Sequence, residues 1–79
     1  MNKQQDEIAR LVALEKHEIK TDRAWINKLL PIMNDDNEDT LTRSDAYDKI
    51  TMYKERIAGK EAHLAMYASI VATMKKNSK

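Results

Sequence analysis

The chain has no cysteine and no phenylalanine, and only one proline and one glycine among its 79 residues. Without cysteine it can form neither a disulfide nor the usual thiolate zinc site. A chain this short buries only about 60% of the surface of its unfolded state, so small domains need a further source of stability. Association with another chain is the source that remains.

Long apolar runs are also missing. The most apolar stretch, residues 64–74, is interrupted by Ser69 and Thr73, and it is far shorter than the ~20 residues of a membrane-spanning helix. The first ten residues, MNKQQDEIAR, lack the apolar core of a secretory signal. The lack of cysteine fits a reducing compartment. We therefore expect a cytoplasmic protein that has no membrane partner.

The net charge of +1 is unevenly distributed along the chain. Residues 1–33 carry six basic and five acidic groups, and residues 34–45 carry one basic and five acidic groups. Residues 46–79 carry seven basic and three acidic groups. The chain thus has an acidic middle and a basic C-terminal part. A concentrated basic stripe, which is typical of nucleic-acid-binding proteins, is a different distribution of charge.

A first amphipathic helix is predicted over about residues 3–32. Apolar residues recur there at helical spacing and fall on one side of a helical wheel. They are Ile8, Leu11, Val12, Ile19, Ile26, Leu29, Leu30 and Met33. Pro31 should end or kink this helix, and Asn34 could terminate it in the left-handed conformation.

A second helix is predicted over about residues 42–75. Thr42 followed by Asp45 resembles a capping box at its start. Its apolar side carries Ile50, Tyr53, Ile57, Leu64, Ala68 and Val71. Gly59 lies inside this helix and nearly opposite that side, so it marks a bend or a place where the backbone of an outside partner comes close.

These segments, joined by an acidic linker over residues 34–41, predict an all-α fold. Strand patterns are absent, and the simplest arrangement is an antiparallel helical hairpin of two long helices forming a single domain over residues 1–79. A second apolar stripe lies almost opposite Leu64 and Val71, and one hairpin cannot cover both stripes. We therefore expect a homo-oligomer, a dimer that forms a four-helix bundle. The interface residues predicted for this multi-helix bundle are Leu14, Trp25, Met66, Tyr67, Ile70 and Met74.

The acidic run from Asp35 to Asp39 could suggest a calcium-binding loop. With Asp35 as the first position, the sixth is Thr40 where an EF-hand needs glycine, and the twelfth is Ala46 where it needs glutamate. An EF-hand is therefore rejected. A solvated loop is the better interpretation, although its clustered negative charge could imitate phosphate groups for a basic partner.

Three carboxylates, Glu15, Asp22 and Glu61, fall within the apolar stripes of the two helices. Buried carboxylates are costly unless they are paired, so such residues are specificity devices, parts of a site, or residues at the edge of the seam. The last interpretation is favoured: we expect them to meet lysines such as Lys60, or water.

No catalytic constellation is present. His17 and His63 are the only histidines, and neither has a second histidine at metal-binding spacing on the same helix. No Gly-rich phosphate loop and no nucleophile motif occurs. We expect a protein that is not an enzyme and has no metal and no cofactor.

Two functions follow from these patterns. The first is a self-associating adaptor or inhibitor of bacterial or phage type, which acts by binding another protein. The alternative is a binder of nucleic acid or of a small anionic nucleotide ligand at an oligomer interface. Its candidate residues are Lys49, Tyr53, Arg56 and Lys60.

Overall fold

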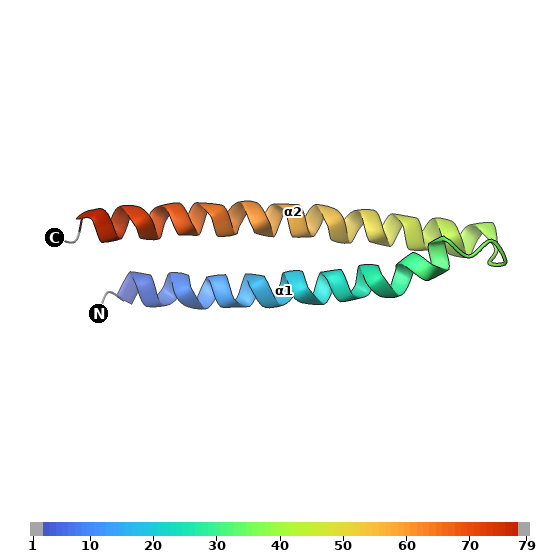
Figure 1. Cartoon of the computed structure of the whole chain (residues 1–79), viewed down its shortest axis with the longest axis horizontal. Coiled ribbons are helices and arrows are strands. Elements are labelled where there is room, and N and C mark those ends of the chain that lie inside the picture. Colours follow the sequence, from blue (N-terminus) through green and yellow to red (C-terminus); the bar gives the residue numbers. More distant parts are fainter. Residues whose placement is uncertain (1–2, 78–79) are drawn as a thin grey trace.

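The computed structural model describes residues 3–77, which form two helices joined by a short loop. Helix α1 spans Lys3–Met33 and helix α2 spans Thr40–Asn77. The helices run antiparallel, side by side, so the start of α1 lies beside the end of α2 (Figure 1). The hairpin is long and thin, with extents of 62 × 15 × 12 Å. The predicted all-α helical hairpin is thus confirmed.

The seam between the helices follows a repeat of three and four residues. Such a repeat averages 3.5 residues and keeps one line of side chains facing the neighbouring helix, as in a coiled coil. In α1 it runs from Gln5 to Met33. In α2 every residue that is buried or half-buried belongs to it: Arg43, Ala46, Ile50, Tyr53, Ile57, Lys60, Leu64, Tyr67, Val71 and Met74.

The core is concentrated in the half of the hairpin nearer the loop. Ile19 and Ile26 of α1 pack with Ile50 and Ile57 of α2, and all four are buried. At the open end, residues 3–18 and 58–77 include no buried residue. The seam there is apolar but only half covered, because two helices alone enclose little space.

The start of α2 is capped by Asp39. Its carboxylate accepts hydrogen bonds from the Thr42 backbone N–H at 2.7 Å and from the Thr42 hydroxyl at 3.0 Å. These bonds lower the pKa of Asp39 below its usual value. The helix therefore begins at Thr40, two residues before the predicted start, and the predicted cap at Thr42 was wrong. Thr42 does belong to a capping motif, but as the hydrogen-bond donor inside the first turn.

Helix α1 continues past Pro31 as far as Met33. The Asn34 N–H still bonds to the Leu30 carbonyl at 3.0 Å, which extends the helical pattern by one residue. Asn34 does not adopt the predicted left-handed conformation, since no described residue has a positive φ. In Figure 1 the last turn of α1 inclines toward α2.

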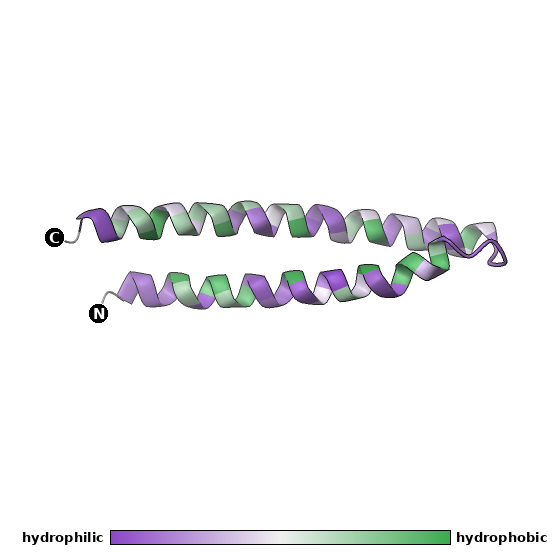
Figure 2. Ribbon diagram, viewed as in Figure 1, coloured by the Kyte–Doolittle hydropathy of each residue, from purple (hydrophilic) through white to green (hydrophobic). Residues whose placement is uncertain are grey.

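Arg43, which belongs to α2, caps the C-terminal end of α1. Its Nε donates a hydrogen bond to the Met33 carbonyl at 3.0 Å, and its Nη2 lies 3.7 Å from the Asp36 carboxylate. A cation is favourable here because the last carbonyls of a helix carry partial negative charge. In the loop, the Asp35 carboxylate accepts a hydrogen bond from the Asn37 N–H at 2.9 Å. The connection is thus a structured turn of residues 34–39, and Figure 2 shows it as hydrophilic.

Candidate interaction surfaces

Three polar pairs join the helices across the seam in one antiparallel register: two are ion pairs, and the third is a hydrogen bond between Glu15 and His63. Each step of three or four residues along α1 is matched by an equal step backward along α2. The pairs are Glu15–His63 at 2.9 Å, Glu18–Lys60 at 3.1 Å and Asp22–Arg56 at 3.5 Å.

Two of these carboxylates, Glu15 and Asp22, lie deeper than predicted. Asp22 is buried, with its side chain only 5% exposed, so its expected place at the seam's edge was wrong. The reason is positional, because Glu15 and Asp22 both belong to the line of residues that faces α2. One oxygen of each accepts no hydrogen bond from the described residues. Glu61 is different: it is exposed and pairs with Arg23 at 3.5 Å.

One face of the hairpin collects most of the large apolar side chains that remain exposed. Residues seven apart lie on the same side of a helix, and Glu18 and His63 flank the seam on this face. Leu11 and Trp25 are each seven residues from Glu18, and Ile70 is seven residues after His63. Six of the eight large apolar residues exposed in the described chain lie here, and together they define the Trp25 face: Leu11, Leu14, Trp25, Met52, Met66 and Ile70.

Four of the six predicted interface residues lie on this face. Leu14, Trp25, Met66 and Ile70 are between 40% and 54% exposed. Tyr67 and Met74 were assigned to the same outer stripe, but both are half-buried in the seam, because they continue its three-four repeat. Leu11 was predicted on the apolar side of the first helix but is 43% exposed on the Trp25 face, because the three-four repeat of the seam passes through Ile8 and Val12. Met52 was not predicted at all, and it becomes part of this surface only once the hairpin forms.

Gly59 lies in the middle of the Trp25 face. It stands halfway between Met52 and Met66, and α2 passes through it without a break (Figure 1). A Cβ atom added at Gly59 would meet nothing within 4 Å. The hairpin itself therefore has no need of glycine at this position, although glycine costs about 1 kcal/mol relative to alanine inside a helix.

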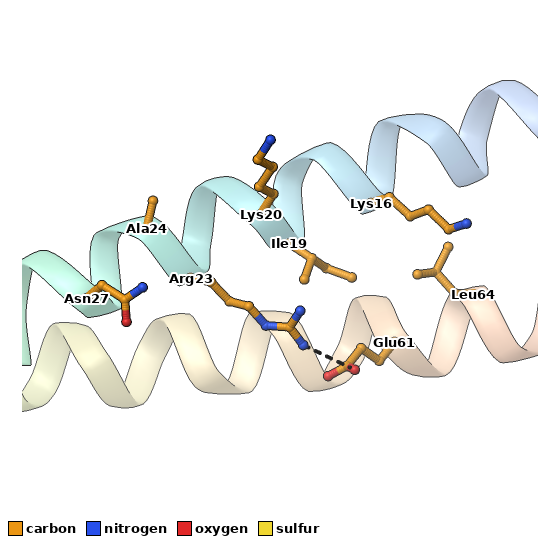
Figure 3. Close-up of a pocket in the computed structure, with 8 residues that line it drawn as sticks. All are labelled: Lys16, Ile19, Lys20, Arg23, Ala24, Asn27, Glu61 and Leu64. Carbon is orange, nitrogen blue, oxygen red and sulfur yellow. Dashed lines mark ion pairs between the residues drawn. The ribbon is translucent and has the colours of Figure 1, made fainter.

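The opposite face carries two open grooves. In the first groove, of about 560 Å³, the Arg23 side chain extends across to pair with Glu61, while the Lys20 side chain points away from α2 (Figure 3). The other, of about 720 Å³, lies at the open end of the hairpin. Its apolar lining residues are Ile8, Ala9, Val12, Leu64, Tyr67, Ala68 and Val71.

The three cations among the four predicted anion-binding residues form ion pairs within the chain. Arg56 and Lys60 meet the carboxylates of α1, and Lys49 pairs with Asp45 at 3.0 Å one turn away. Tyr53 is half-buried, and the Arg56 guanidinium lies over its ring at 5.9 Å. The three cations therefore lie beside carboxylates and do not gather into a concentrated positive patch.

The described residues offer no group of three or more histidine or acidic side chains that could hold a metal ion. Neither α1 nor α2, over residues 3–77, combines the length and the apolarity needed to cross a membrane. His17 is exposed. The chain matches no protein-family model, no curated protein and no solved structure.

Proposed function

We propose that this chain is a small, non-enzymatic interaction protein that associates with itself through the Trp25 face and acts by binding another protein, as an adaptor or an inhibitor. One observation carries the proposal: among residues 3–77, six of the eight large apolar side chains that are exposed lie on one face. Single exposed apolar residues are normal on a soluble protein, but large apolar residues gathered on one face are typical of an interaction surface.

The energetics favour covering this face. At about 25 cal/mol per Å², every hundred Å² or so of apolar surface that a partner covers on this face contributes roughly 2–3 kcal/mol. That gain is a large fraction of the whole stability of so small a domain. The carboxylates of Glu18 and Asp22 beside this face already pair with Lys60 and Arg56, and that of Glu15 is hydrogen-bonded to His63. A second surface that packs there leaves these carboxylates with partners.

The apolar groove at the open end is the proposed binding site for the partner protein. Val12, Leu64 and Val71 line it and are only half-buried. An amphipathic helix can lay its apolar side into a groove of this kind. Self-association through the Trp25 face leaves this groove accessible, because the two surfaces lie on opposite faces of the hairpin.

The self-association is tested with Ile70→Glu. We expect this variant to lower both the molar mass measured by light scattering and the melting temperature, because a charge on the Trp25 face opposes its burial. The matched control is Ala62→Glu, which places the same charge on an exposed outer position of α2. The control should behave like the wild type. A wild-type monomer at tens of micromolar would contradict self-association.

The groove is tested separately with Ala68→Glu, since Ala68 is exposed and lines it. We expect this variant to keep the molar mass of the wild type. In a pull-down from the native cell, it should fail to capture a partner protein that the wild type captures. Retention of the same protein by Ala68→Glu would contradict binding through the groove.

The alternative, binding of nucleic acid or of an anionic nucleotide through Lys49, Tyr53, Arg56 and Lys60, has less support, because each of the three cations already has a carboxylate partner. It predicts binding with a steep salt dependence that is lost when these charges are reversed. A salt titration of wild type and charge-reversed chain with a single-stranded oligonucleotide separates the two functions.

A further inference from the structure

We propose that the occupant of the Trp25 face is a second copy of this chain in antiparallel orientation, with the two α2 helices closest at Gly59. This inference rests on the proposed self-association and adds its geometry. Three independent features point to it: the glycine, the symmetry of its surroundings and the distribution of charge along the hairpin.

Gly59 is a place where another backbone can approach. Glycine destabilises the interior of a helix relative to alanine, and the space beyond its Cα is open. Since no contact within the hairpin uses that space, an outside neighbour is the remaining structural reason for glycine on this face. A residue without a side chain lets two backbones come closer than any other residue does.

The surroundings of Gly59 are symmetric. It lies nineteen residues after Thr40 and eighteen before Asn77, so it is the midpoint of α2. Met52 and Met66, both exposed on the Trp25 face, each lie seven residues from it. A two-fold axis through Gly59 places Met52 of one copy against Met66 of the other, and the reverse contact forms on the other side. Such self-complementary contacts define a two-fold dimer.

The charges select the antiparallel orientation. Residues 34–45, at the loop end, carry five acidic groups and one basic group. The last turn of α2, at the opposite end, carries Lys75 and Lys76. In an antiparallel dimer the acidic end of each copy lies beside the basic end of the other. A parallel dimer would bring the two acidic ends together, and such repulsion disfavours it.

The crossing point is tested with Gly59→Met. We expect this variant to raise the dimer dissociation constant at least tenfold in sedimentation equilibrium, while the helix content of the dilute chain is kept or increased. The matched control is Ala62→Met, which adds a side chain of the same size on the outer side of α2 and should leave the dissociation constant unchanged. Dimerisation of Gly59→Met as tight as that of the wild type would overturn the proposal.

The orientation is tested with a spin label on Ser44→Cys, which is unique because the chain has no cysteine. Ser44 is exposed and lies fifteen residues before Gly59, so two labels in the antiparallel dimer are about 45 Å apart at 1.5 Å per residue. A separation of about 10–20 Å, set by the distance between packed helices, would mean a parallel dimer. That result overturns only this inference, whereas a monomeric chain would also overturn the proposed self-association.

Discussion

Asp22 is buried in the seam of a hairpin whose apolar core consists of few residues. Its carboxylate lies 3.5 Å from Arg56, and one of its oxygens accepts no hydrogen bond within the described chain. Removing an ion from water is costly, and a loosely bonded pair recovers only part of that cost. Arg56 is half-exposed, so it can turn to solvent if its partner is removed.

We therefore predict that Asp22→Leu stabilises the hairpin by about 1–2 kcal/mol, since leucine adds apolar contacts where a desolvated charge stood. Denaturant unfolding measures the change. Asp48→Leu is the control, because Asp48 is exposed and leucine there should leave stability nearly unchanged. A loss of several kcal/mol in Asp22→Leu would show instead that the ion pair belongs to a tightly coupled network.

Asp39 should make stability depend on acid pH. Its pKa is lowered in the folded chain by the hydrogen bonds from Thr42. A lowered pKa means that the cap stabilises the fold above the ordinary pKa of aspartate, and that this contribution is lost as pH falls through the folded value. Asn caps helices as well as Asp does but has no charge to lose. The melting temperature of wild type, compared with Asp39→Asn, should therefore fall more steeply between about pH 5 and pH 2. Parallel curves would contradict this.

The register of the two helices is set by pairs that cross the seam. Glu18 and Lys60, 3.1 Å apart, are both partly shielded from water. Glu18→Lys should lower stability by about 1 kcal/mol, because it places two cations together, and adding Lys60→Glu should restore most of the loss. A double-mutant cycle by denaturant unfolding measures this coupling. The same exchange in the exposed Asp45–Lys49 pair within α2 should show a coupling of only about 0.3–0.5 kcal/mol.

The two helices and their antiparallel arrangement could be predicted from the sequence, because Ile19, Ile26, Ile50 and Ile57 recur at helical spacing and lie in the observed core. The details of the seam could not. The apolar residues alone occupy only some positions of the three-four repeat. Polar residues such as Lys60 occupy the other positions. Whether such a residue faces the neighbour or the solvent depends on the register between helices, which no local pattern contains.

The ends of the helices depend in the same way on distant contacts. Asp39 and Thr42 are both favourable capping residues, so the sequence allows either start for α2. The bond from Arg43 to the Met33 carbonyl joins residues ten positions apart and fixes the short turn between the helices. Leu11 was placed on the seam side and Met52 was missed for a related reason, since a surface made by two helices is defined only when their relative rotation is known.

At the scale of the whole molecule, the hairpin buries few residues over a length of 62 Å. A chain that gains much of its stability from a second copy is stabilised by its own concentration. We predict that the melting temperature of the wild type rises by several degrees over a roughly hundred-fold increase in concentration. The melting temperature of Ile70→Glu should not change with concentration. A constant wild-type value would contradict association as a source of stability.

The short turn between the antiparallel helices also sets an order for folding. Arg43 and Met33, beside the turn, are separated by 10 residues, whereas Glu15 and His63, toward the open end, are separated by 48. Closing a longer loop costs more chain entropy, so contacts beside the turn form first and the seam closes toward the termini. Substitutions at Arg43 should then mainly slow folding, while substitutions at Val71 should mainly speed unfolding.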